Sequence, residues 1–254
     1  MKVWYDLHMH SCLSPCADDD MTPCNMAGMG MLKGLSVMAL TDHNSCKNCP
    51  AFFKACEGYG ILPLAGTELS TAEDIHMVSL FETLEEAMAF DEALDSHRMD
   101  LPNNPAIFGN QLIMGEDDRP LGTFGPLLIA ATDLWMGDAA ALVRSFGGVI
   151  YPAHIDRPAN GIVSVLGDLP GGYGFTAVEF HDRDKIPLYR ERYAEVEGKR
   201  LVVSSDAHTL GAISEAENFF ELDLEEDAPP GELRRALFRF LRQDEKLPPL
   251  SRKI

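Results

Sequence analysis

Short apolar runs alternate with helical segments along most of this chain, and this alternation limits its fold more than any other feature. The runs are β-branched or continuously apolar, as strands are when both faces of a sheet are covered. Strands are expected at residues 3–7, 36–40, 61–65, 75–80, 148–151, 176–180 and 201–204. Helices are expected at residues 26–33, 51–58, 84–97, 137–146, 187–197 and 231–243. The pattern predicts an α/β fold built from parallel βα units.

The length of 254 residues is usual for one α/β barrel, so we expect a single domain over residues 1–254. The stretch at about 82–134 breaks the repeat, because residues 111–114 and 121–124 flank a turn-rich segment and predict a hairpin. We interpret this stretch as a small insertion over the mouth of the barrel. Two roles are open for it: a lid that shapes substrate choice, or a loop that merely caps the barrel.

Acidic side chains outnumber basic ones by 40 to 21, which gives a formal net charge of −19. A charge of this sign repels phosphate backbones at long range, so we expect no extended nucleic-acid surface. The sequence has no long apolar run and no secretion-signal pattern before its first strand. We therefore expect a soluble, cytoplasmic protein that does not bind membranes and keeps its cysteines mostly reduced. Its oligomeric state is open.

Two histidines, His8 and His10, follow the first expected strand at a spacing of two residues. Residues at this spacing in a strand point to the same face, so the two imidazoles would project together. Such a pair can chelate one metal ion, although it also arises by chance. The number of further ligand-type residues in the same setting decides between these readings.

Further ligand-type side chains fall at the ends of the other expected strands. They are His43, Glu68, His76, His154, Asp206 and His208. Together with the first pair, these positions include six of the eight histidines in the chain. In parallel α/β barrels the ends that follow the strands form the active-site face, so the side chains should converge on one cavity. Their number exceeds what one ion takes and predicts a multinuclear metal site.

The order, spacing and residue types of these motifs resemble those of the PHP (polymerase and histidinol phosphatase) superfamily. The motifs are Asp6-Leu7-His8-Met9-His10-Ser11, Leu40-Thr41-Asp42-His43-Asn44, Gly66-Thr67-Glu68, Pro152-Ala153-His154 and Ser205-Asp206-Ala207-His208. The resemblance implies a distorted TIM-like (β/α)7 barrel that hydrolyses phosphate esters. It also implies up to three divalent transition metals per chain, with Zn, Fe or Mn as the candidates.

The resemblance further implies how the ligands are shared among three ions. The first ion would be held by His8, His10, Glu68 and Asp206, and the second by the bridging Glu68 with His76 and His154. The third would be held by His43, His208 and one residue of the loop after His10.

This last ligand is open between two residues of that loop. An ungapped alignment of the loop gives Cys16, and an alignment with a short insertion gives Asp18. A soft thiolate at Cys16 would favour zinc or iron over magnesium. In the alternative, Cys16 is a buried thiol, and the third site is held by Asp18 or left half empty.

The expected chemistry is attack on a small phosphate ester by a hydroxide that bridges two ions, whose charge also stabilises the phosphoryl oxygens. Glu68, as the bridging carboxylate, and Asp206 and His208, as proton-transfer groups, are the expected catalytic residues. Asp6 and Asp42 are expected to accept hydrogen bonds from ligand imidazoles and so fix their tautomers.

Three side chains are candidates for binding the substrate phosphate at the mouth of the cavity: Arg157, Arg183 and His181. For the two arginines, surface ion pairs with Asp156 and Asp182 are the alternative. Two other functions stay open, a non-catalytic metal-stabilised PHP module and an amidohydrolase-like C–N hydrolase. Hydrolases of the latter class use a carboxylated lysine after a middle strand, and no lysine in this sequence occupies such a position.

Overall fold

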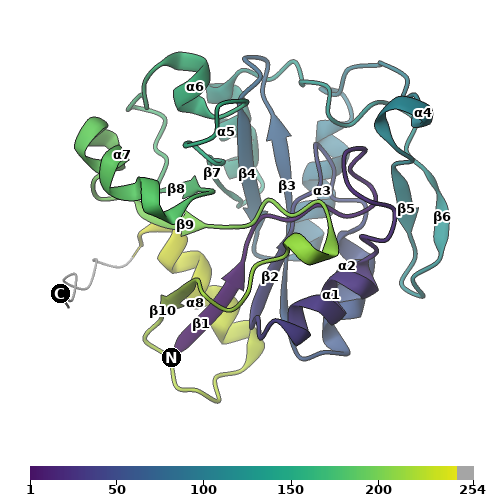
Figure 1. The fold of residues 1–254 in the computed structure, drawn as a ribbon, viewed down its shortest axis with the longest axis horizontal. Coiled ribbons are helices and arrows are strands. Elements are labelled where there is room, and N and C mark those ends of the chain that lie inside the picture. The colour runs from purple at the N-terminus through teal and green to yellow at the C-terminus, as the bar shows by residue number, and fades with distance from the viewer. Residues whose placement is uncertain (245–254) are drawn as a thin grey trace.

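A curled six-stranded sheet is the centre of the computed structural model, which describes residues 1–244 (Figure 1). Its strands lie in the order β10 (Phe219–Glu221), β1 (Lys2–Asp6), β2 (Val37–Leu40), β3 (Leu62–Ser70), β4 (His76–Phe81) and β7 (Val149–Pro152). A separate parallel pair, β8 (Ala177–Phe180) and β9 (Arg200–Val203), follows, with β8 in contact with β7. The segment after β9 returns to the segment after β1, where Met9 and Ala207 form an isolated parallel bridge. The sheet therefore curls like part of a barrel.

Helices pack against both faces of the sheet. They are α1 (Pro23–Leu32), α2 (Cys49–Glu57), α3 (Leu84–Leu94), α4 (Pro105–Phe108), α5 (Met136–Ser145), α6 (Ile162–Leu166), α7 (Ile186–Arg192) and α8 (Pro230–Arg242). Short 3₁₀ turns occur at η1 (Arg183–Lys185), η2 (Ala194–Val196) and η3 (Leu210–Ala212). None of the helices within residues 1–244 has both the length and the apolar composition needed to cross a bilayer.

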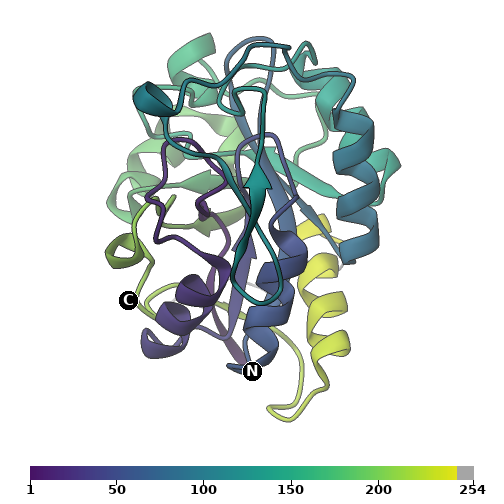
Figure 2. The ribbon, with the colours of Figure 1, turned by 90° about the vertical axis from the view of Figure 1, so that its right-hand side faces the viewer.

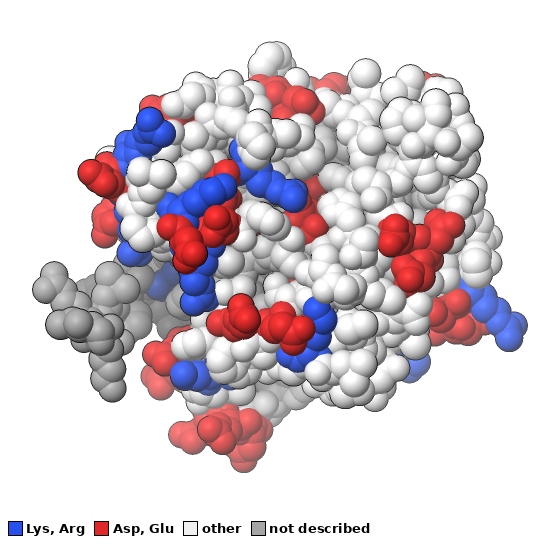
Figure 3. All heavy atoms as spheres, in the orientation of Figure 1, with Lys and Arg blue, Asp and Glu red and all other residues white. Residues whose placement is uncertain are grey.

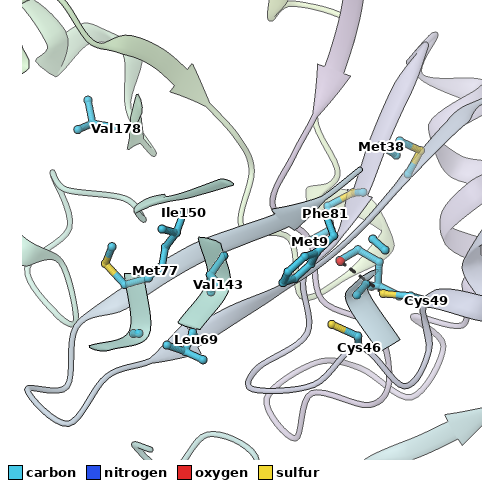
Figure 4. Packing of buried hydrophobic residues seen from close by; sticks show 14 of the residues in the cluster. Met9, Met38, Cys46, Cys49, Leu69, Met77, Phe81, Val143, Ile150 and Val178 are labelled. Atoms are coloured by element: carbon cyan, nitrogen blue, oxygen red, sulfur yellow. Dashed lines mark hydrogen bonds between the residues drawn. The ribbon is translucent and has the colours of Figure 1, made fainter. Parts of the chain in front are cut away.

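Strand side chains alternate between two apolar layers. In β2, Met38 and Leu40 belong to the layer against α1, α2, α3 and α5, whereas Val37 and Ala39 belong to the layer against α8. Figure 4 shows part of the first layer, in which Met38 lies with residues of β3, β4, α5 and β7. This period of two is what a strand covered on both sides requires.

Each of the seven strands expected from the sequence is present, and the α/β class is confirmed. The orientation of one strand differs from the expectation, because β4 is antiparallel to both β3 and β7. Ser70 pairs with His76 across the β3–β4 turn, which leaves no room for the crossover that a parallel pair requires. The short strand β10, antiparallel to β1, was not predicted. The seven-stranded closed barrel stays a prediction.

The hairpin expected within 82–134 forms from β5 (Leu112–Met114) and β6 (Pro120–Thr123), and Figure 2 shows it in front of the sheet. Asp118 in its turn accepts hydrogen bonds from Thr22 Oγ1 at 2.7 Å and from the backbone N–H of Cys24 at 3.1 Å. Asn48 donates to the Leu112 carbonyl oxygen at 3.0 Å and accepts from the Met114 N–H at 2.9 Å. The hairpin is thus fastened to the start of α1 and the start of α2. The division into one domain with a lid-like insertion stays a prediction.

Candidate metal centre

The ligand-type side chains predicted from the sequence meet at one end of the sheet. His8 and His10 follow β1, His43 follows β2, Glu68 lies in β3, His76 opens β4, His154 follows β7, and Asp206 and His208 follow β9. The reversal of β4 explains why His76 joins the others. Because β4 runs against β3, its first residue lies beside the last residue of β3, where Ser70 pairs with His76.

Glu68 is the centre of this cluster. It is 1% exposed, and its two carboxylate oxygens face five imidazole nitrogens from four segments of the chain. The distances are 2.8 Å to His76 Nδ1, 3.0 Å to His154 Nε2, 3.1 Å to His43 Nδ1, 3.3 Å to His8 Nε2 and 3.3 Å to His10 Nε2. One carboxylate therefore connects all of these imidazoles.

Asp206 is the second carboxylate of the cluster. Its Oδ1 lies 3.1 Å from His10 Nε2 and 3.4 Å from His8 Nε2, while its Oδ2 pairs with the Arg157 guanidinium. His208 Nδ1 donates to the backbone oxygen of Asp206 at 2.8 Å. That bond leaves His208 Nε2 with a lone pair.

Three overlapping groups of these side chains have donor atoms close enough to share an ion. They are His8, His10, Glu68 and Asp206; His43, Glu68 and His76; and His10, His43 and His208. Within each group the donor atoms all lie within 4.8 Å of one another. The first group is the set expected for the first ion. In the second group His43 stands where His154 was expected, although His154 Nε2 also lies beside Glu68.

The donor set fits transition metals. Two ligand atoms bound to one ion at about 2.1 Å lie about 3.0–3.4 Å apart, which is close to the spacing found here between imidazole nitrogens and carboxylate oxygens. His154 Nδ1 is buried without a hydrogen-bond partner, and His43 Nδ1 lies near Glu68 without making a hydrogen bond. Neutral imidazoles in excess over two carboxylates are the donors that Zn, Fe and Mn sites use.

The charges in the cluster favour lone pairs over protons at several rings. Burial and the neighbouring His10 hold the pKa of His43 well below its ordinary value and lower the pKa of His208 to about 4. Burial alone would lower the pKa of His8, but nearby carboxylates raise it well above its ordinary value. Burial would likewise raise the pKa of Glu68, yet the surrounding imidazoles hold it well below. The cluster thus combines ionised carboxylates and neutral imidazoles at His43 and His208 with a His8 ring that must release a proton when it binds a cation.

The backbone is left-handed at three positions of this end of the sheet. The φ angle is +46° at Asn44, +27° at His154 and +53° at Asp206. Asn44 is fixed by its side chain, which donates to the carbonyl oxygens of Leu128 and Ala130 at 2.8 and 2.9 Å. Residues other than glycine adopt such angles only where surrounding contacts fix them.

Asp6 and Asp42, which were predicted to accept hydrogen bonds from imidazoles, accept them mainly from other groups. Asp42 Oδ1 accepts from Ser14 Oγ at 2.7 Å, and Ser14 Oγ in turn lies 3.0 Å from His10 Nδ1. Ser14 Oγ therefore accepts the His10 Nδ1 proton, which leaves His10 Nε2 free to face the carboxylates. Asp6 accepts from the backbone N–H groups of Ser205 and Ser214 at 3.1 and 3.0 Å.

Neither candidate for the third-ion loop ligand is in the three groups of donor atoms. Cys16 and Asp18 are both exposed, so the alternative in which Cys16 is a buried thiol is wrong on that point. The protein around the Cys16 sulfur and the Glu68 carboxylate raise the pKa of the Cys16 thiol to about 12, so this thiol lies within the field of the cluster. The Asp18 backbone N–H donates to the His208 carbonyl oxygen at 3.0 Å. The loop thus contacts the cluster through the main chain of Asp18.

The three phosphate-binding candidates separate into two places. Arg157 lines a cavity of about 420 Å³ together with His43, Glu68, His76, His154, Pro158, Ala159, Asn160, Asp206 and His208. Arg183 and His181 line another cavity, of about 650 Å³, and Arg183 bonds to Asn218 there. Only Arg157 of the three therefore lies in the cavity that the ligand-type side chains line.

Two residues that contact ligand rings were missed in the sequence. Ser14 is one, and Glu179 of β8 is the other, with Oε1 at 2.8 Å from His8 Nδ1. Glu179 carried a signal, because it is the charged residue of an otherwise apolar strand, Ala177-Val178-Glu179-Phe180. A buried strand carries a carboxylate only where a partner compensates its charge.

Comparison with known proteins supports the resemblance seen in the sequence. The sequence model of the PHP domain family matches residues 6–111. No curated protein matches the chain. Among solved structures, a putative metal-dependent phosphoesterase from Bifidobacterium adolescentis has a TM-score of 0.59 and 19% identity, with 92% of this chain and 96% of that chain covered.

Two further similar structures are endonucleases. The lesion-specific endonuclease PfuEndoQ from Pyrococcus furiosus has a TM-score of 0.63 and 18% identity, and a complex of Endonuclease Q with a 27-mer duplex has 0.61 and 17%. Each alignment covers 96% of this chain but only 56% and 57% of the endonuclease. The chain thus spans little more than half the length of these proteins.

These endonucleases correct the prediction that there is no extended nucleic-acid surface. The complex contains a duplex substrate with an abasic lesion at the active site of a similar fold, so the prediction, drawn from net charge, is wrong. A net charge averages over the whole surface and does not describe the potential around one site. Figure 3 shows basic side chains lying among acidic ones over β8, β9 and α7.

The family match runs from Asp6 to Gln111, just before β5, and it includes the first five ligand-type residues of the cluster. The remaining three, His154, Asp206 and His208, come from later segments that the fold brings to the same place. Both the family match and the assembled cluster agree with the motifs in the sequence. Residues 6–111 of the chain are therefore similar to the PHP domain family, and the later segments complete the same cluster.

Proposed function

We propose that this chain is a metal-dependent phosphoesterase that hydrolyses a small phosphate ester. The observation that carries the proposal is the surrounding of Glu68, whose buried carboxylate has five imidazole nitrogens within 3.3 Å. A carboxylate has two oxygens, and each can bind a different cation. A cluster of this composition at the edge of a cavity suits a multinuclear site.

The three groups of donor atoms support sites for up to three divalent transition metals. His8, His10, Glu68 and Asp206 would hold the first ion, and Glu68 would bridge to a second with His76 and His154 or His43. His43 and His208 would hold the third. When bound, such cations supply positive charge that stabilises the phosphoryl oxygens and lower the pKa of the attacking water.

Two residues of the chain itself act on substrate and protons in this proposal. Arg157 lines the cavity and carries a planar guanidinium, which suits two-point binding of phosphate oxygens. Its pairing with Asp206 fixes where this positive charge lies. His208 keeps its proton on Nδ1 against a carbonyl oxygen, so its Nε2 is free to bind a cation or to take up a proton.

The size of the cavity supports a small substrate, because about 420 Å³ lies within the range of small-molecule sites. A phosphodiester in DNA is the second candidate substrate, favoured by the similarity to Endonuclease Q. The two candidates place different demands on the mouth of the cavity. A small phosphate ester must fit inside the cavity, whereas a DNA duplex must stay outside and place one phosphodiester in it.

The test is hydrolysis of a panel of esters by purified protein with added Mn, Zn or Fe. The panel contains sugar phosphates, nucleoside monophosphates, a nitrophenyl phosphate and a duplex with one abasic site. We expect metal-dependent release of inorganic phosphate from at least one small monoester, and loss of this activity with a chelator. Cleavage of the duplex alone would assign the site to DNA, and no hydrolysis of any ester by metal-loaded protein would contradict the proposal.

The ligand of the third ion is tested by substituting the two loop candidates. If Cys16 is the ligand, Cys16→Ala should lose one metal per chain and Cys16→His should keep it, because an imidazole can replace a thiolate. Asp18→Ala should then keep the full metal content. Metal analysis of the three variants beside the parent protein measures this. The reverse result, with loss only in Asp18→Ala, assigns the position to Asp18.

A further inference from the structure

Glu179 is a buried carboxylate that belongs to none of the three groups of donor atoms. It is 1% exposed and lies in β8, where all four residues are buried. Ala177, two residues before it, belongs to the apolar layer against α8, so the Glu179 side chain points toward that layer too. An ionised carboxylate in such surroundings is costly unless hydrogen bonds compensate it. The contacts of the Glu179 carboxylate therefore indicate its role.

One oxygen of Glu179 makes two bonds to ligand residues. Oε1 lies 2.8 Å from His8 Nδ1 and accepts from the backbone N–H of His154 at 3.1 Å. His8 and His154 follow different strands, β1 and β7. One carboxylate oxygen thus fixes a ring from one strand and the main chain of another.

The bond to His8 determines which ring nitrogen is available to a metal. A carboxylate oxygen can only accept, so His8 carries its proton on Nδ1. The nitrogen left for a metal is then Nε2, which lies 3.3 Å from Glu68 and 3.4 Å from Asp206. This is the arrangement in which a carboxylate orients a metal-binding histidine and increases its basicity.

The bond to His154 supports a strained backbone. His154 has φ of +27°, and its own backbone N–H donates the hydrogen bond to Glu179 Oε1. The following N–H, of Ile155, donates to the Glu179 backbone oxygen at 2.9 Å. With the chain fixed at both points, the His154 ring places Nε2 3.0 Å from Glu68 Oε1.

We propose that Glu179 is a positioning residue of the metal centre, which orients His8 and His154 together and raises the affinity of the site for metal. This inference rests on the proposed function, because it requires that the cluster binds metal. Glu179 does not touch substrate and acts only through the two histidines. Its second oxygen, Oε2, is buried and unpartnered, as is Tyr151 Oη.

The test measures Co²⁺ binding to three variants without reference to activity. Glu179→Gln keeps an oxygen that accepts both bonds but removes the charge, whereas Glu179→Ala removes both. We expect Glu179→Gln to weaken Co²⁺ binding about 10- to 100-fold in competition with a chromophoric chelator, and Glu179→Ala to weaken it further. The visible absorption of bound Co²⁺, which reports coordination, should change in Glu179→Ala.

Asp91→Asn is the matched control. Asp91 is also a 1% exposed carboxylate, but it pairs with Lys47 and Arg98 instead of ligand residues. This control should keep the Co²⁺ affinity of the parent protein even if its melting temperature falls. If Glu179→Ala does not fold, Glu179→Gln alone decides.

Two negative results have different meanings. Parent-like Co²⁺ affinity in Glu179→Gln and a parent-like spectrum in Glu179→Ala would overturn the inference and leave the proposed function intact. Failure of the parent protein to bind Co²⁺ at all would contradict the proposed function first, and this inference with it.

Discussion

Glu68→Gln is expected to lower metal-dependent ester hydrolysis by at least about a thousandfold while the protein stays folded. Charge stabilisation by bound cations is worth several kcal/mol to such a reaction, and each 1.4 kcal/mol corresponds to about tenfold in rate. Glutamine keeps the shape of the side chain but has no charge and only one accepting oxygen. Five imidazole nitrogens lie within 3.3 Å of Glu68, so the substitution acts at the centre of the proposed site.

The measurement is the rate of phosphate release with the best substrate of the panel, together with circular dichroism to verify the fold. Glu86→Gln is the matched control, because it makes the same chemical change in the capping box of α3, where glutamine also serves. The control should retain full activity. Activity in Glu68→Gln within tenfold of the parent protein would remove Glu68 from the mechanism.

Addition of metal is expected to raise the melting temperature of chelator-treated protein by roughly 8–16 °C. A ligand at a thousandfold excess over its Kd stabilises the folded state by about 4 kcal/mol, and a chain of this size gains about 2–4 °C per kcal/mol. The physical reason is that the unfolded chain does not hold these side chains together. In the folded chain His8, His10 and Glu68 are at most 1% exposed and already face one another.

The rise in melting temperature is measured by thermal unfolding with and without Zn or Mn. Elemental analysis of the loaded protein gives the number of ions per chain. We expect more than one and up to about three ions per chain. Magnesium at the same concentration is the control, since imidazole-rich sites prefer transition metals to it. No bound metal and no shift with any of the ions would contradict a metal centre in this chain.

The sequence predicted the strands well because each is a short apolar run that two layers cover. Those runs also located the ligand-type residues, since the chain places functional side chains where strands end. Asp206 illustrates this, because it is separated from His10 by most of the chain and still lies 3.1 Å from its ring. The position of each residue at the end of an apolar run was sufficient to predict that meeting.

The reversal of β4 was not predicted because an apolar run carries no information on direction. The missing signal was the length of the connection, as the segment between Ser70 and His76 is too short for a crossover. Glu179 was missed for a different reason. Its role depends on a contact with His8, from a distant part of the sequence, that no local pattern encodes.

The third-ion ligand could not be chosen from the sequence, because two alignments of one loop fit equally well. In the structure this loop is fixed from outside by the hairpin, with the Leu112 N–H donating to the Cys12 carbonyl oxygen at 2.7 Å. Its conformation thus depends on residues about a hundred positions away. Cys16 and Asp18 are both left exposed by it, and metal analysis has to decide between them.

The left-handed backbone at His154 and Asp206 sets a trade-off between robustness and chemistry. Each such residue costs about 1 kcal/mol or more, which is a considerable part of a net stability of about 5–15 kcal/mol. Glycine would relieve the cost at either position, but glycine has no imidazole and no carboxylate. Selection for a more stable chain and selection for a competent centre therefore favour different residues at the same two positions, and extra stability must come from elsewhere in the fold.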